Sequence, residues 1–519
     1  MTGGTAAGRH CLLSRRSDMY PIWYSMTMVV LSIVVLFFMI VKLKIHPFIT
    51  MTVVAVGLAL AMGVPLIDPK TGIFAVMEPA MGKQLGHMVP LIALGCVIGE
   101  IIRRSGGSEV LGEKMLQRIG NKRGPLAMTM CGLLVGSTIF FDTGVILLAP
   151  VTIAVARQSR KSIIFFAIPM AIAVLGMHSI VPPHPGAVAI ATALNVNFGL
   201  LIMYGLLAML PGAGIAFLYS QWAARKLTGN GTLDLDAAYD GGSPTAGGTS
   251  DGTTPAAAGD PAFEEPGGSG GTSSTVVAAP ARSTTLTSLE GHERPAVGTL
   301  LFVLLLPIVL ILIQTLAGSL QIGGPAQTVL DILAFLGTPW LALTITVFCA
   351  YGLLLTPRVR RGESISFFGM QGMKPVGEIL VSTGGGVAFG SIIGASGVGK
   401  QLLDTLADIH LPLVLFGFVL AAILRATLGT TTAAVTFVAV LLAQSFDTTS
   451  LNPSQLALLA VGVSAGGMCL SNFNDAGFWV LSRYFGIGEQ VMLKTWTVGV
   501  TIMGCVTATI ASLLWLAVS

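Results

Sequence analysis

Long apolar runs separated by short polar stretches dominate this chain. Ten of them have about the length needed to cross roughly 30 Å of hydrocarbon as helices. They cover residues 26–41, 47–67, 86–102, 163–180 and 199–222 and, further along, residues 297–316, 332–355, 376–393, 453–470 and 495–518. The pattern predicts an all-α polytopic membrane protein.

Two other apolar regions, residues 125–156 and 411–444, are interrupted by polar and glycine residues. Two short apolar pieces, residues 185–195 and 476–485, cannot span a bilayer alone. Backbone that is broken at membrane depth is tolerated only where it faces protein or a water-filled cavity. We therefore expect a re-entrant hairpin and a broken helix in each half of the chain.

A polar segment separates the two halves. Of the 68 residues from 228 to 295, 47 are Gly, Ser, Thr, Ala or Pro, and nine are acidic against two basic. Such a segment buries too little apolar surface to offset its ordering entropy, so we expect a disordered acidic cytoplasmic linker. The predicted parts are a polar N-terminal segment, a first membrane repeat, the linker and a second membrane repeat. They cover residues 1–20, 21–227, 228–295 and 296–519.

Unusual features recur in the two halves in the same order. An offset of 291 residues relates Ser105-Gly106 to Ser396-Gly397, Met177 to Met468, and Gly186 to Gly477. With the N-terminus outside, 19 Lys and Arg residues fall on the cytoplasmic side and six outside, which follows the positive-inside rule. This predicts inverted-topology repeats, each with about five to six transmembrane helices. Paired broken helices of this kind are typical of the binding site of a secondary transporter.

Composition excludes several classes of protein. The chain is 53% hydrophobic and 10% charged, whereas soluble domains carry about 25% charged residues. A water-soluble enzyme, a nucleic-acid binder and a disordered protein are thereby excluded. The six cysteines are scattered, and no metal-ligand or nucleotide-binding motif stands out. We expect neither a cofactor nor enzyme activity.

Four ionisable residues lie inside apolar sequence, where a charge costs several kcal/mol and commonly marks a functional site. Asp142 and Arg425 lie at the interruptions, whereas His184 and Asp475 occupy equivalent positions of the two predicted repeats. By contrast, His178 and Glu100 lie at predicted helix ends, where we expect them to face the membrane interface.

These residues suit a small polyhydroxylated or amino acid anion. Arg425 can bind a carboxylate through two parallel hydrogen bonds. Asp142, Asp475 or His184 can take up and release a proton. Short polar side chains near the breaks can contact hydroxyl groups: Thr143, Thr430, Thr431, Thr432, Ser471, Asn472 and Asn474.

Structural alternatives exist for each charged candidate. Arg425 can instead neutralise Asp142 or Asp475 in a buried ion pair. His184 can satisfy hydrogen bonds at a helix break. Asp142 can cap the second half of its broken helix.

Several motifs follow one another along both halves. They are Ser-Gly-Gly at 105–107, Ile-Phe-Phe-Asp-Thr-Gly at 139–144, Pro-Pro-His-Pro-Gly at 182–186, residues 425–432, Asn-Asp-Ala-Gly-Phe-Trp at 474–479 and Lys-Thr-Trp-Thr at 494–497. At these motifs the sequence resembles the gluconate permease family, the gluconate:proton symporters. The family usually has Glu-Val where this chain has Asp142-Thr143, and His-Val where it has Asn472-Phe473.

The resemblance implies proton-coupled uptake of gluconate or a related sugar acid across the bacterial inner membrane, by a fold that often forms a homodimer. Our hypothesis is a secondary active transporter whose partners are the organic anion, protons and the lipid bilayer. Arg425 would bind the carboxylate, Asp142 or Asp475 would carry the proton, and His184 would shape the site or relay protons. The alternatives are a permease for D-serine or another amino acid or carboxylate, and a channel-like facilitator without proton coupling.

Overall fold

The computed structural model describes residues 21–120, 123–228, 295–320, 324–355, 364–373, 376–396, 412–445 and 450–518. The predicted N-terminal segment, residues 1–20, and all but the two ends of the predicted linker lie outside the described residues. Within the described ranges, every regular element is a helix.

The helices before the linker are α2 (Ile22–Val41), α3 (Pro47–Ala61), α4 (Ile73–Arg104), α5 (Gly107–Ile119), α6 (Gly124–Gly136), α7 (Phe141–Ser159), α8 (Ile164–Ile180), α9 (Pro185–Ala193) and α10 (Phe198–Thr228). Those after it are α12 (Val297–Ser319), α13 (Gly324–Leu336), α14 (Pro339–Leu354), α16 (Ile365–Met373), α17 (Val376–Ala395), α19 (Leu413–Leu428), α20 (Thr431–Ser445), α21 (Pro453–Met468), α22 (Ala476–Phe485), α23 (Glu489–Met492), the π-helical turn η4 (Leu493–Thr497) and α24 (Val498–Val518).

Long apolar helices dominate the described part of the chain. Seven helical stretches there are long and apolar enough to cross a membrane, and the bent pair of α13 and α14 can supply an eighth. The all-α polytopic class predicted from the apolar runs is therefore confirmed. The helices α5 and α16, which are shorter than the spans, were not predicted.

The prediction of one continuous helix over residues 332–355 is wrong. The chain bends by 69° between α13 and α14. Pro339 is the first residue of α14, and Thr338 before it has φ −56° and ψ 136°, which is not a helical conformation. A proline disfavours the helical conformation of the preceding residue, so the apolar run continues while the helix does not.

The predicted interruptions are present in both halves. Residues 137–140 separate α6 from α7, and residues 429–430 separate α19 from α20. Each pair is followed by a largely buried helix, α8 or α21, and then by a short one, α9 or α22. The order of elements is thus the same in both halves. The opposite orientation of the halves in the membrane remains a prediction.

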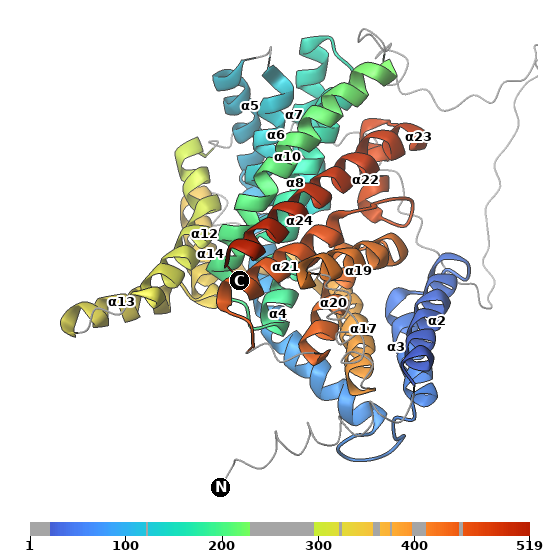
Figure 1. The fold of residues 1–519 in the computed structure, drawn as a ribbon. Helices are drawn as coiled ribbons and strands as arrows, with labels where there is room; N and C mark the ends of the chain where they lie inside the picture. The colour runs from blue at the N-terminus through green and yellow to red at the C-terminus, as the bar shows by residue number, and fades with distance from the viewer. Residues whose placement is uncertain are drawn as a thin grey trace, which may run out of the picture. The chain divides into compact units, whose positions relative to one another are not determined.

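Helices from the two halves pack against one another. The long helices α10 and α24 lie side by side (Figure 1), as do α6 with α8 and α19 with α21. The second arm of each interrupted pair packs on the short helix of the opposite half, α7 on α22 and α20 on α9. The helix breaks of one half therefore lie against the other half.

Candidate functional site

The short helices α9 and α22 are each capped at the N-terminus by the side chain of the preceding residue. His184 precedes α9, and its Nδ1 accepts a hydrogen bond of 3.2 Å from the backbone N–H of Gly186. Asp475 precedes α22, and its Oδ1 accepts one of 3.0 Å from the backbone N–H of Gly477. Each side chain satisfies a backbone donor that the first helical turn leaves unpaired. An imidazole and a carboxylate thus cap equivalent helices in the two halves.

Arg425 is buried in the last turn of α19, with 2% of its surface exposed. Its Nη2 forms an ion pair with Oδ2 of Asp475, and its Nη1 donates to the backbone carbonyl of Gly429. Among the described residues, its Nε has no hydrogen-bond partner. Of the two carboxylates that the sequence offered to Arg425, the structure pairs it with Asp475. Within the part of the chain that the structure describes, the Nε–H donor of the guanidinium group is therefore unused.

Gly429 brings the two breaks of the second half into contact. It ends α19 with φ +76°, in the left-handed region that favours glycine. A Cβ atom at this position would overlap the backbone of Asn474. The side-chain amide of Asn474 also donates a hydrogen bond of 3.2 Å to the carbonyl of Ala426. The end of α19 is therefore fixed against the loop before α22.

Asp475 is held by a small polar network. The hydroxyl of Ser471 donates to its Oδ2 and accepts a hydrogen bond of 2.7 Å from the indole N–H of Trp496. With Arg425 and Gly477, this gives the carboxylate three donors, which compensates for its burial. We name Arg425, Asp475, Ser471 and Trp496 the arginine cluster.

The first half places two histidines together at its break. The ring centroids of His178 and His184 lie 3.7 Å apart, and the ring of Phe140 meets His178 edge-on at 5.4 Å. The expected interfacial position of His178 is wrong, since the residue is buried. The reason is that α8 is buried along its whole length and continues into the buried loop before α9.

The start of α7 connects the first half to the arginine cluster. The ring of Phe141 packs on Trp496 with a centroid separation of 5.4 Å, and it occupies the space that a side chain at Gly477 would need. Asp142 follows in the first turn of α7, where the helix dipole favours an acidic group. The predicted proton carrier Asp142 is thus the neighbour in sequence of the ring that packs on Trp496, and it is itself exposed.

The predicted hydroxyl-binding residues divide into two groups. Those of the second half lie at or next to the start of α20 and in the loop between α21 and α22; they are Thr430, Thr431, Thr432, Ser471, Asn472 and Asn474. Thr143 lies apart from them, on α7, where it lines a cavity.

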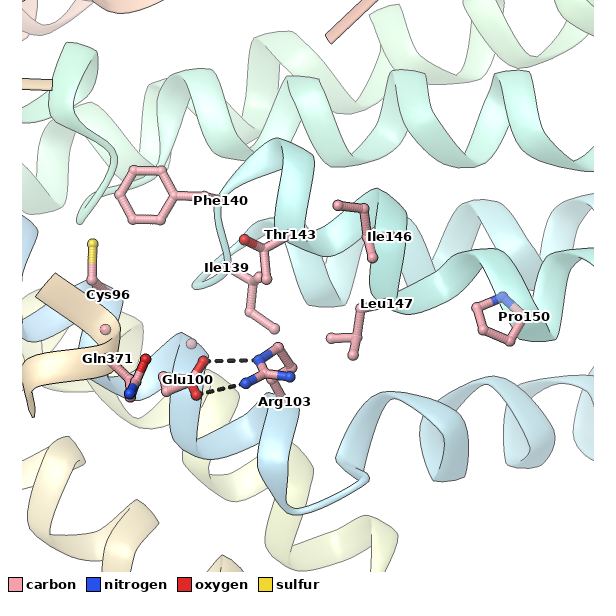
Figure 2. Close-up of a pocket in the computed structure, with 12 residues that line it drawn as sticks. Cys96, Glu100, Arg103, Ile139, Phe140, Thr143, Ile146, Leu147, Pro150 and Gln371 are labelled. Atoms are coloured by element: carbon pink, nitrogen blue, oxygen red, sulfur yellow. Dashed lines mark hydrogen bonds and ion pairs between the residues drawn. The ribbon is translucent and has the colours of Figure 1, made fainter. Parts of the chain in front are cut away.

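This cavity has a volume of about 340 Å³ and lies between α4, α7 and α16. Its polar lining comes from Glu100, Arg103, Thr143 and Gln371. Figure 2 shows the Glu100–Arg103 pair on α4 with Ile139 and Thr143 across from it. The rest of the lining is mostly apolar and comprises Cys96, Gly99, Ile139, Phe140, Ile146, Leu147, Pro150 and Gly372.

Glu100 is paired with two arginines at this cavity. Its carboxylate accepts hydrogen bonds from Arg103 at 2.6 and 2.8 Å and from Nε of Arg104 at 2.9 Å. The expected interfacial exposure of Glu100 is wrong, because its side chain is only 12% exposed and lines the cavity. Sequence reasoning also missed Arg103 and Gln371. The spacing of Glu100 to the two arginines, three and four residues on, was the available signal.

Comparison with known proteins gives a consistent result. The sequence matches the GntP family permease model over residues 24–239 and 272–518. It is 30% identical over 477 residues to the inner membrane permease YgbN of Escherichia coli (strain K12), covering 91% of this chain and 94% of that one. It is 29% identical to the gluconate permease of Bacillus subtilis (strain 168), covering 92% and 96% of the two chains. The low-affinity gluconate transporter of Escherichia coli (strain K12) is 28% identical, with coverage of 92% and 95%.

Among solved structures, the chain is similar to the YdaH transporter of Alcanivorax borkumensis, with a TM-score of 0.49, 16% sequence identity and coverage of 91% and 98%. The relatives by sequence are permeases, and the described helices include at least seven apolar spans. The protein is accordingly a multi-pass transporter of the inner membrane rather than an enzyme, and it belongs to the GntP permease family.

Proposed function

We propose that this protein is a secondary active transporter that couples proton entry to the uptake of gluconate or a related small sugar acid. The relatives named for gluconate include those of Bacillus subtilis and Escherichia coli described above. The observation that carries the proposal is the buried ion pair of Arg425 and Asp475 where two helix breaks meet. Arginine suits a carboxylate because its planar guanidinium group offers two parallel donors.

Competition between the carboxylates of Asp475 and the substrate for Arg425 couples substrate binding to proton binding. In the structure, the carboxylate of Asp475 occupies the Nη2 side of the guanidinium group. A proton bound at Oδ2 of Asp475 removes the negative charge, and the substrate carboxylate then takes its place beside Arg425. An unpaired buried charge costs several kcal/mol, so Arg425 keeps one negative partner throughout. Substrate and proton therefore bind together, as a symporter requires.

The surrounding groups recognise the rest of the substrate. The threonines at the start of α20 and the asparagines before α22 offer donors and acceptors to the hydroxyl groups of a sugar acid. Ser471 holds Oδ2 of Asp475 and is itself held by Trp496, so it positions the proton acceptor. His184 shapes the neighbouring break of the first half. Asp142, on α7, is the second candidate for the proton site.

Transport by purified protein in proteoliposomes tests this function. We expect radiolabelled gluconate to accumulate above its external concentration under an inward proton gradient, and an uncoupler to abolish the accumulation. Uptake that only equilibrates would indicate a facilitator, and accumulation that persists with uncoupler would exclude proton coupling. Unlabelled gluconate should compete with the label more strongly than D-serine does; the reverse order would indicate an amino-acid permease.

A further inference from the structure

We propose that the cavity between α4, α7 and α16 is a second binding site for the transported sugar acid, where Arg103 receives the carboxylate. This inference rests on the proposed function, since its ligand is the same substrate. The site is distinct from the arginine cluster, because it is formed around Glu100 and Arg103 of α4.

The cavity has the character of a small-molecule site. Its volume of about 340 Å³ falls within the range of about 300–1,000 Å³ that is usual for ligand pockets. Its walls are mostly apolar, and a few polar groups converge on it, which is the common composition of such pockets. The hydroxyl of Thr143 and the amide of Gln371 are suited to hydroxyl groups, as the guanidinium group of Arg103 is to a carboxylate.

The charges at the cavity permit exchange of a partner. Glu100 is paired with both Arg103 and Arg104. A substrate carboxylate can therefore take Arg103 away from Glu100 without leaving Glu100 unpaired, because Arg104 stays in place. That avoids the main cost of breaking a partly buried ion pair, which is an uncompensated charge.

Arg103 and Arg104 differ in their surroundings, and this difference favours the exchange at Arg103. The guanidinium group of Arg104 stacks over the ring of Phe367 on α16, 4.7 Å from its centroid. Arg103 instead lines the cavity, and 43% of its side-chain surface is exposed. Arg104 is thus held by both Glu100 and Phe367, and Arg103 is the arginine that lines the cavity within reach of a ligand.

Residues 139–141 connect this cavity to the arginine cluster. Ile139 and Phe140 line the cavity and also a small recess that contains His178 and His184. The next residue, Phe141, packs on Trp496 of the arginine cluster. A sugar acid in the cavity therefore lies one short segment of chain away from the cluster, as expected of a holding site on the substrate's path.

Uptake kinetics in proteoliposomes test whether the cavity binds the substrate through Arg103. We expect Arg103→Gln to raise the KM for radiolabelled gluconate by roughly tenfold or more, because a charge-assisted pair with the carboxylate is lost. Arg103→Lys keeps the charge but not the two parallel donors, so its KM should lie between those of the wild type and Arg103→Gln. Arg118→Gln is the matched control. It removes the same charge from α5, where Arg118 is exposed and does not line the cavity.

The outcomes separate this inference from the proposed function. Failure of the wild type to take up gluconate contradicts the proposed function itself. If the wild type takes up gluconate but Arg103→Gln leaves the KM unchanged, only the second site is overturned. The same holds if Arg118→Gln raises the KM as much as Arg103→Gln does, because the effect would then reflect charge at long range. If Arg103→Gln yields no folded protein, Arg103→Lys decides, and an unchanged KM in that variant overturns the site.

Discussion

At the scale of single residues, Asp475 combines a structural and an electrostatic role. One of its oxygens caps α22 through Gly477, and the other faces Arg425 and Ser471. The two roles use different atoms, so they can be separated by a substitution that keeps the shape of the side chain and removes its charge.

We expect Asp475→Asn to keep the helix cap, because an amide oxygen also accepts the N–H of Gly477. Arg425 then loses its partner, and breaking a buried pair costs about 3–5 kcal/mol. The variant should unfold at a lower temperature than the wild type, and gluconate should stabilise it more. In proteoliposomes, gluconate exchange should continue while proton-driven accumulation is lost.

Asp142→Asn is the matched comparison for that experiment, since it removes a carboxylate from the start of α7. We expect it to retain accumulation. Loss of accumulation in Asp142→Asn together with full accumulation in Asp475→Asn would move the proton site to α7.

The sequence showed which residues to suspect but not how they pair. Asp142, His184, Arg425 and Asp475 stood out because each lies in apolar sequence. The partner of Arg425 depends on which helix breaks meet in space, and apolar periodicity carries no information on that. The hydrogen bond of His184 agrees with the structural alternative that the sequence allowed, because a polar side chain directly before a proline-started helix is a usual cap position.

At the scale of helices, the end of α19 depends on Gly429. An alanine there would adopt a left-handed backbone, at a cost of about 1–2 kcal/mol, and its Cβ would overlap Asn474. Overpacking adds typically about 1–3 kcal/mol. We expect Gly429→Ala to lower the thermal unfolding midpoint of the purified protein and to weaken gluconate binding.

Gly486 provides the control for the steric part of this effect. It also has a positive φ, +61°, at the end of α22, but open space surrounds it. Gly486→Ala should therefore show only the backbone cost. Equal losses of stability in the two variants would mean that the contact with Asn474 contributes nothing.

Helix breaks are easier to predict from the sequence than short helices such as α5 and α16. Glycine and polar residues marked both interruptions, and the predicted piece 476–485 coincides with α22. The bend before Pro339 does not interrupt the apolar run, so hydropathy alone does not reveal it. The helix α16 is short and lies far along the chain from α4, against which it packs. The cavity between them therefore could not be foreseen from either segment alone.

At the scale of the whole molecule, the predicted inverted topology places residues of the two halves on stated sides of the membrane. Lys70 should face the outside, and Arg157 and Arg483 should face the cytoplasm. Single cysteines at these positions, in a chain whose native cysteines are replaced by serine, can be tested with an impermeant thiol reagent on intact cells. We expect labelling at Lys70→Cys without permeabilisation, and at Arg157→Cys and Arg483→Cys only after it. Labelling of Arg483→Cys from outside would exclude the inverted arrangement.

The equivalent caps at His184 and Asp475 have a consequence for how such a transporter can diversify. The backbone at each position demands only an acceptor for one N–H group, and it leaves the charge of the side chain unspecified. Imidazole, amide and carboxylate all meet that demand. A side chain of any of these three kinds can therefore replace another at either position without loss of the helix cap, while the charge at position 475 stays constrained by its buried partner Arg425.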